Sequence, residues 1–574
     1  MAVQTSYPGV YVTELPSGVR TVTGVATSVT AFVGMTQRGP KNKATTINSL
    51  ADYERVFGGL YKGGMVSFAV RDFFANGGGQ AVVVRLVSTD KDAKNMATPA
   101  QLTLVAKEPE KPRESQATTD KTEEAAPARR TQTAAQAVQE PLVLQAVNEG
   151  TWANGLQATV DHKTPPSIAK EVAKQLGVEE TDLFNLVVRL GDKGPQEVFR
   201  NVTLVKSSRQ VDAVLLAESQ LVQVAPGTDL TLPGLTRPAP IPDKSPATVS
   251  VKGSDGAALA PGDYIGSEGN DMSSNHEGLY ALDHVDLFNL LCIPPAALGG
   301  DTDPLVYQEA QTYCAKRRAV LIVDPPSDMT VANALDARSG PSEKKKKNLA
   351  DLNLTGEEAR NSVLYFPRLQ QPDPTADGGR IGTFVGCGAI AGVIARTDAT
   401  RGVWKAPAGV DATLTGISGL AVNLTDAENG MLNPHGINCL RTFPGTGTVL
   451  WGARTLRGAD HLGDEYKYLP VRRLALHIEE SLFRGTKWVM FEPNDESLWA
   501  QIRLNVGAFM HNLFRQGAFQ GTTARDAYFV KCGRETTTPN DVNAGQVNIV
   551  VGFAPVRPAE FVVLQIQQIA QAQA

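Results

Sequence analysis

Hydrophobic and polar positions in the first hundred residues predict two strands separated by two helices. A short apolar run over 29–34 predicts a strand, and the pattern over 49–57 predicts a helix that Gly58-Gly59 ends. A second helix is expected over 66–76, before three glycines, and the run 81–87, which is apolar except for Arg85, predicts a buried strand. Strand, helix and strand in this order are typical of an α/β layer.

The same succession of predicted strands and helices returns after about residue 261. Apolar runs over 287–293, 319–324 and 363–366 each precede a proline, and a helix is expected over 307–316. Continuous apolar runs are typical of strands whose sheet is covered on both faces. We therefore expect one sheet to be built from both halves of the chain.

The stretch between these halves has a different composition. Residues 107–141 consist mainly of Ala, Thr, Gln, Glu, Lys and Pro, which predicts a disordered linker because little apolar surface can be buried. Strand-like segments return over 142–224, and 226–261 is rich in turn residues. The span 101–260 is therefore predicted to be an inserted, variable, β-rich domain.

Two amphipathic helices are predicted in the last 120 residues. Leu474, Ile478 and Leu482 mark one face of the first, which Gly485 ends. The second is expected over 494–516, with Asn494 or Asp495 as its N-cap.

Both ends of the chain read as extended segments. Near the C-terminus, apolar residues alternate over 547–553, and a second strand-like run covers 561–566 beyond two prolines. At the N-terminus, turn signals at Pro8-Gly9 and Pro16-Ser17-Gly18 interrupt strand formers. A terminal apolar strand with no receiving partner exposes a sheet edge.

These patterns predict a multidomain fold of the α/β and α+β classes: an α/β sheet domain, a C-terminal α+β domain, extended N- and C-terminal β arms, and the inserted β-rich domain. The predicted boundaries are 1–24 for the N-terminal arm, 25–100 and 261–454 for the α/β domain, 101–260 for the insertion, 455–554 for the C-terminal domain and 555–574 for the C-terminal arm.

Length and composition narrow the possible functions. A chain of 574 residues is too long for one core, and 55 Lys plus Arg against 60 Asp plus Glu argue against a nucleic-acid-binding or membrane-surface protein. Five scattered cysteines without a C-x-x-C pair predict neither disulfides nor zinc and favour a reducing compartment. No signal peptide is recognised, and the apolar run 384–395 is too short to cross a bilayer.

Few motifs suggest chemistry. Gly386 to Ala391 fits G-x-G-x-x-A, either as a dinucleotide loop or as a small-residue helix packed closely on a sheet. We favour the helix, because no strand of proper length precedes the motif and the best-placed acid, Asp411, lies beyond a loop. A nucleotide-binding enzyme therefore remains only as an alternative.

The seven histidines, among them His435, His477 and His511, form no recognised metal or hydrolase motif. We expect no catalytic residue, cofactor or metal. The run Lys344 to Lys347 is interpreted as a solvated loop. Arg472-Arg473 lies where cations oppose the helix dipole, so a salt bridge and a partner contact stay equally open.

Several motifs resemble one known family, the contractile tail sheath proteins of bacteriophages and related contractile injection systems. The N-terminal signature is Tyr7-Pro8-Gly9-Val10-Tyr11-Val12-Thr13-Glu14, and similar segments follow in the family's order at 27–34, 38–40, 57–59, 73–78, 401–409, 433–438, 449–456 and 469–474. The resemblance covers roughly 1–90 and 262–574, whereas the insertion matches only at 149–156.

The resemblance implies a non-enzymatic subunit that polymerises as stacked rings around an inner tail tube and contracts to drive the tube through an envelope. Implied partners are further copies of the chain, the inner tube protein, and baseplate and tail terminator proteins, without nucleic acid or membrane insertion. The implied location is a virion tail or injection-system particle assembled in the bacterial cytoplasm. A type VI secretion-like sheath component remains an alternative, although one chain with both arms favours the single-component type.

In this family the terminal arms add strands to the C-terminal-domain sheets of neighbouring subunits. The resemblance also implies that the C-terminal domain lines the lumen and touches the tube, and we expect helix 494–516, with Arg503 and Arg515, to be its tube-facing element. It also implies an interface of arm and acceptor residues: Val10, Tyr11, Val12, Val22, Val547, Ile549, Val551, Val562, Leu564 and Ile566.

Overall fold

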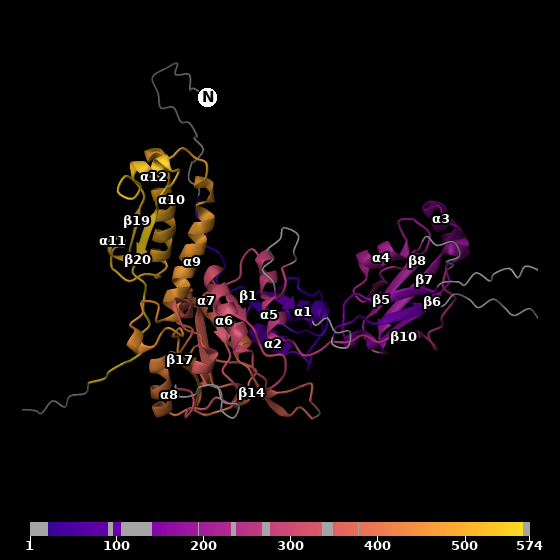
Figure 1. Ribbon diagram of the computed structural model, residues 1–574, viewed down its shortest axis with the longest axis horizontal. Helices are drawn as coiled ribbons and strands as arrows, with labels where there is room; N and C mark the ends of the chain where they lie inside the picture. Colours follow the sequence, from indigo (N-terminus) through magenta and orange to yellow (C-terminus); the bar gives the residue numbers. More distant parts are fainter. Residues whose placement is uncertain are drawn as a thin grey trace, which may run out of the picture.

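The computed structural model describes residues 21–89, 96–104, 141–192, 194–230, 237–266, 276–335, 348–376 and 378–565. Val10, Tyr11, Val12, Ile566, the lysine run 344–347 and all but the last residue of the predicted linker lie outside these ranges. Figure 1 shows a central sheet unit with the insertion on one side and a helical unit, formed by the last hundred residues, on the other.

An eight-stranded sheet forms the centre. Its strands, in spatial order, are β18 (Gly447–Trp451), β17 (Ile437–Phe443), β13 (Ser362–Phe366), β12 (Val320–Val323), β11 (Leu290–Cys292), β1 (Thr30–Gly34), β3 (Ala81–Arg85) and β2 (Thr45–Ile47). The six inner strands are parallel, and the two edge strands are antiparallel to their neighbours. The predicted single sheet from both halves of the chain is thus confirmed.

Both faces of this sheet are buried, as the continuous apolar runs predict. In β1, Ala31 and Val33 face one core while Phe32 faces the other. Helices α1 (Leu50–Phe57), α2 (Val66–Ala75) and α7 (Cys387–Arg401) cover the Phe32 side, and α5 (Pro261–Ile265) and α6 (Pro304–Lys316) cover the opposite side. A small antiparallel sheet of β14 (Leu369–Pro372), β15 (Ile381–Phe384) and β16 (Gly419–Leu420), with helix α8 (Asp426–Leu432), completes the unit.

The insertion forms an antiparallel seven-stranded sheet with its own core. Its strands, in spatial order, are β8 (Gln196–Val202), β7 (Phe184–Leu190), β6 (Leu156–Asp161), β10 (Ala247–Val251), β4 (Gln101–Leu104), β5 (Leu142–Ala146) and β9 (Val222–Val224), with helices α3 (Pro166–Leu176) and α4 (Val211–Glu218). Polar contacts join it to the central unit: Arg85 donates to the Glu149 carbonyl at 2.8 Å, and Tyr61 donates to Asp255 at 2.9 Å.

The helical unit contains α9 (Leu469–Gly485), α10 (Glu496–Arg515), α11 (Ala524–Ala527), β19 (Tyr528–Lys531), α12 (Pro539–Asn543) and β20 (Val550–Phe553). Both predicted amphipathic helices are confirmed, and Asp495 caps α10. Helix α9 joins two cores, because Leu476 packs in the central unit and Ile478 in the helical unit. The predicted strand 547–553 is shortened to β20, and the described part of run 561–566 is extended without being a strand.

Candidate assembly interface

The glycine motif at residue 386 is part of a packed helix. A Cβ at Gly388 would lie 2.0 Å from the Ala69 carbonyl oxygen of α2, so only glycine permits this approach of α7. The buried Asp324 carboxylate accepts hydrogen bonds from the Gly386 and Cys387 amides at 3.1 and 2.9 Å. The small-residue interpretation is confirmed, because an acidic side chain of the protein occupies the helix end that a phosphate would need.

The described residues hold few other groups suited to metal binding, catalysis or membrane insertion. There, no group of three or more His, Cys, Asp or Glu side chains could hold a metal ion. Within the same ranges, no helix combines the length and apolar character needed to cross a membrane. His477 lies between Gly24 and Phe509, and burial lowers its pKa to about 4.

The two arginines at the start of α9 make contacts within the chain. Arg473 binds Asp398 of α7 through two hydrogen bonds of 2.7 and 2.5 Å, and both side chains are buried. Arg473 also donates to the Thr27 carbonyl at 2.9 Å. The salt bridge that the sequence left open is therefore present for Arg473, and Arg472 pairs with Glu479 at 3.5 Å.

The first described residues run along α9. The Val25 amide donates to Ser481 at 3.2 Å, and Val22 packs over Gly485, where a Cβ would come within 2.6 Å. Val22 is only 5% exposed. Our expectation that Val22 belongs to a free arm needs correction, because its side chain fills a gap in its own subunit.

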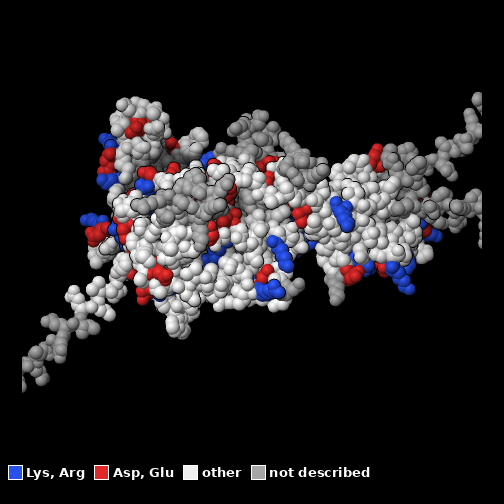
Figure 2. All heavy atoms as spheres, turned by 60° about the horizontal axis from the view of Figure 1, so that its bottom comes forward, with Lys and Arg blue, Asp and Glu red and all other residues white. Residues whose placement is uncertain are grey.

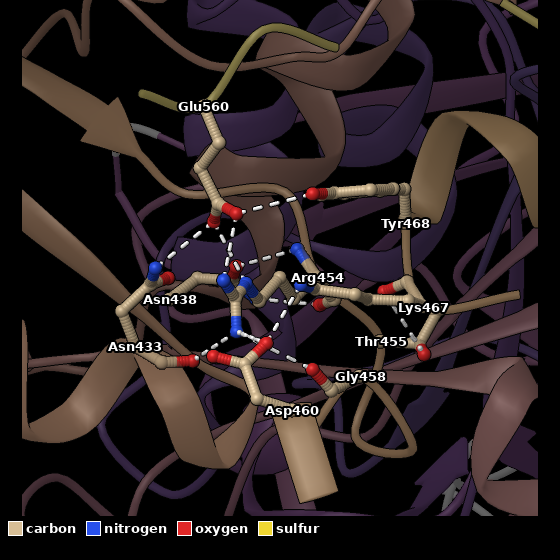
Figure 3. A network of polar contacts seen from close by, with 9 residues as sticks. All are labelled: Asn433, Asn438, Arg454, Thr455, Gly458, Asp460, Lys467, Tyr468 and Glu560. Carbon is tan, nitrogen blue, oxygen red and sulfur yellow. Dashed lines mark hydrogen bonds and ion pairs between the residues drawn. The ribbon is translucent and has the colours of Figure 1, made fainter. Parts of the chain in front are cut away.

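The C-terminal segment is held at a buried ion pair (Figure 3). Glu560 accepts hydrogen bonds of 2.7 and 2.6 Å from Arg454, whose side chain is fully buried. Arg454 also binds Asp460 at 2.9 Å, while Asn433 and Tyr468 donate to Glu560 at 2.9 and 3.2 Å. Partial burial alone would raise the pKa of Glu560, but the hydrogen bonds from Arg454 and Asn433 bring it below its usual value. We call this cluster the C-terminal anchor.

Immediately after the anchor, four apolar side chains lie in solvent. Phe561, Val562, Val563 and Leu564 are 74–83% exposed, and none of them belongs to a strand. The segment leaves the molecule as an extended chain (Figure 1). An exposed apolar run of this kind is typical of a segment that another surface receives.

A sheet with two open edges lies in the helical unit. β19 and β20 pair antiparallel from Tyr528↔Phe553 to Lys531↔Val550, and no third described strand joins them. Tyr528, Val530, Val551 and Phe553 contact the core of the unit, as do Val547 and Ile549 just before β20. A two-stranded ribbon is marginal by itself, and its free edges can accept further strands.

The two arginines expected to face a tube, Arg503 and Arg515, differ in their contacts within the chain. Arg503 donates to Glu496 at 2.7 Å and to the Cys532 carbonyl, so it braces α10 against the chain after β19. Arg515 is exposed at the end of α10. Sequence reasoning missed Arg454 and Glu560, although Glu560 is the single charged residue in 558–574 and precedes the apolar run.

Open sheet edges together with an anchored, exposed apolar segment are typical of a structural subunit that associates with other chains. The comparisons with known proteins agree with this class. The model for the phage tail sheath protein central domain matches residues 270–456, and that for the phage tail sheath C-terminal domain matches 463–569. The chain belongs to the phage tail sheath protein family.

Individual relatives match over shorter regions. The tail sheath protein of Vibrio phage KVP40 is 32% identical over 127 residues, which are 22% of this chain and 18% of that protein. The tail sheath protein of Burkholderia phage BcepMu is 26% identical over 245 residues, or 41% of this chain and 47% of that protein. The chain thus matches less than half the length of these relatives.

The fold as a whole has a solved counterpart. The sheath complex of an extracellular contractile injection system, PVC, in its contracted state, aligns over 99% of both chains with a TM-score of 0.52 and 21% identity. At 21% identity, this similarity shows that the two proteins share a fold.

Proposed function

We propose that this protein polymerises into the contractile sheath around the inner tube of a phage tail or phage-like injection system, and that contraction drives the tube through a target envelope. One observation carries the proposal: the helical unit holds a two-stranded sheet with open edges, and the same chain carries an exposed apolar segment that leaves from a buried anchor beside the central unit. The two features are complementary between copies of one chain.

Strand addition supplies the connection between subunits. Each main-chain hydrogen bond contributes about 0.5–1.5 kcal/mol net, so a handful per arm can outweigh the ordering cost of the arm. Residues 555–574, with Val562, Leu564 and Ile566, form the C-terminal arm of one subunit. β19, β20 and the preceding Val547 and Ile549 receive the arm, and Val551 lies in β20. Val10, Tyr11 and Val12 form the N-terminal arm, which begins before the buried Val22.

The remaining assignments follow from the same arrangement. The parts of the chain work as an N-terminal arm, a two-part α/β domain, an inserted domain at 101–260, a C-terminal domain at 455–554 and a C-terminal arm. Helix α10, with Arg515 exposed, faces the tube. The inner tube protein, baseplate and tail terminator are the partners, the particle is assembled in the bacterial cytoplasm, and the chain acts without cofactor or catalysis.

Contraction is a rigid-body rearrangement of subunits whose arms remain joined. Energy is stored at assembly, so no nucleotide is consumed. The α7 terminus, which Asp324 occupies, supports this part of the proposal. Sheaths that contract only with nucleotide hydrolysis by this chain would contradict it.

The proposal is tested by removing the arm while the anchor stays. A chain ending at Glu560 should remain a folded, soluble subunit with an unchanged melting temperature, because the removed side chains at 561–564 are exposed. Electron microscopy should show no tubes from this variant, whereas the full chain forms long striated tubes. Removing 560–574 takes away the anchor as well and should also lower the melting temperature, since Arg454 then loses its buried partner. Tubes at the yield of the full chain from both truncations would overturn the arm assignment.

A further inference from the structure

An unusual loop joins α9 to α10. After the short helix Lys487–Val489, Met490 is 65% exposed and Phe491 is completely exposed. Phe491 adopts φ +69°, a left-handed conformation that is strained for a residue with a bulky side chain. A fully exposed ring gains nothing within its own chain that would offset this strain. Strain held at an exposed apolar residue points to a contact made outside the subunit.

An apolar groove lies at the other end of the α9–α10 pair. It has a volume of about 900 Å³ and is lined by Trp404, Trp451, Tyr468, Gln516, Phe561 and Val562, among others. This volume accommodates more than one large side chain. Figure 2 shows that much of the underside of the molecule, where the C-terminal segment leaves, carries uncharged residues.

The loop and the groove carry opposite charges. Arg401 and Lys405 line the groove, as does Glu560, whose charge is paired with Arg454; Arg401 lies 3.6 Å from the exposed Asp411. Glu492, Asp495 and Glu496 follow Phe491 in the loop and the first turn of α10. Cations beside the groove therefore match an acidic flank beside the exposed aromatic ring, which favours this pairing over two like ends meeting.

The loop cannot enter the groove of its own subunit. Tyr468 precedes α9 and Gln516 follows α10, so the groove lies at the ends of the helices that the loop does not join. A helix of 17 residues separates loop and groove by about 26 Å. A projection and a groove at opposite ends of one rigid unit form a heterologous pair, and repetition of that contact builds an open row of subunits.

We propose that Met490 and Phe491 of one subunit insert into the groove between Trp404 and Trp451 of a second copy. This inference rests on the proposed function and names a contact between sheath subunits that is separate from strand addition. It explains why an exposed phenylalanine is held in a left-handed conformation. It also explains why the anchored C-terminal segment forms one wall of the groove: the position of that wall depends on the Glu560–Arg454 pair.

The contact is tested by cross-linking with single cysteine substitutions in the full chain. The five native cysteines are buried, so added thiols at Phe491→Cys and Ala408→Cys, the latter in the groove wall, react selectively. When the two variants are mixed and assembled, a short bis-maleimide should give a covalent dimer, and each variant alone should give none. Leu216→Cys, on the insertion and 79% exposed, is the matched control and should not cross-link to Ala408→Cys.

A second measurement uses Phe491→Gly and Phe491→Asp. Neither removes a contact within the subunit, and glycine relieves the backbone conformation, so the Phe491→Gly variant should melt no lower than the native chain. Both variants should raise the protein concentration needed for assembly by about tenfold or more, as expected for loss of an aromatic residue central to an interface.

Each outcome discriminates. Cross-linked dimers from Phe491→Cys alone would mean that two loops meet, which overturns the inference. A cross-link between Ala408→Cys and Ile569→Cys in place of the 491–408 link would show that the C-terminal residues fill the groove, with the same result. If the mixed cysteine variants form tubes but give no cross-link between positions 491 and 408, this inference is wrong and the proposed function stands. If the full native chain forms no polymer at all, both the inference and the proposed function are wrong.

Discussion

At the scale of single residues, a buried acidic side chain occupies a helix N-terminus that could otherwise bind an anion. One carboxylate oxygen of Asp324 accepts hydrogen bonds from the Gly386 and Cys387 amides at the start of α7. The other oxygen has no hydrogen-bond partner in the described structure. Complete burial of a carboxylate favours its neutral form. Burial accordingly raises the pKa of Asp324 to about 6.

This shift predicts a pH dependence of stability. A carboxyl group whose pKa rises on folding binds its proton more tightly in the folded state, so its contribution is greatest below pH 4 and is lost as the pH rises through about 6. The loss amounts to about 3 kcal/mol in the free energy of unfolding. Asp324→Asn should lack this slope. Urea unfolding of both proteins from pH 4 to 7 measures it, and parallel curves would contradict the assignment.

At the scale of elements, α9 is the joint of the molecule. Leu469 and Leu476 on one side of the helix pack in the central unit, and Leu474 and Ile478 pack in the helical unit. The segment 21–27 lies along the same helix, held at Ser481, Gly485 and Arg473. The place from which the N-terminal arm departs is therefore determined by the end of α9.

Two glycine substitutions distinguish the contact between α9 and segment 21–27 from the general effect of glycine on helix stability. Gly485→Ala should displace Val22 and expose residues 21–25, because the new Cβ would lie within 2.6 Å of a valine methyl group. Gly507→Ala in α10 meets nothing within 4 Å and should stabilise the protein by up to about 1 kcal/mol. Hydrogen exchange at 21–27 should rise in the first variant alone. Equal protection in both would show that Gly485 does not seat the segment.

At the scale of the whole molecule, function depends on units that can move while their connections persist. The insertion has its own core, and the polar contacts described at its junction with the central unit come from Arg85 and Tyr61. The helical unit shares α9 with the central unit and carries the open sheet, the loop and one wall of the groove. Rigid-body movement therefore keeps these assembly features together.

The separate core predicts that the insertion folds alone. Residues 96–256 produced as an independent chain should unfold in one cooperative transition, because the buried side chains of the seven-stranded sheet lie within this range. Calorimetry of this fragment and of the full chain provides the measurement. A fragment without a cooperative transition would show that the contacts around Arg85 are required for folding.

The sequence by itself determined the elements whose burial is local. Continuous apolar runs such as 81–84 and 320–323 predicted strands of a sheet covered on both faces, because a strand with two buried faces favours apolar residues on both of them. The amphipathic patterns of α9 and α10 predicted both helices for a similar reason, and local signals predicted the end of α9 at Gly485 and the N-cap of α10. The run 561–566 has the composition of a strand, but a strand also requires a partner, and the single chain provides none for its described residues.

Only the tertiary structure decided the polar contacts between distant segments. Arg454 and Glu560 are 106 residues apart, and Val22 reaches Gly485 across most of the chain. Periodicity reports how a residue is exposed within its own element and carries no information on which remote group will lie beside it. The anchor, the seat of the N-terminal segment and the occupied end of α7 therefore follow from topology, because packing brings those groups together and burial then requires each charge to be paired.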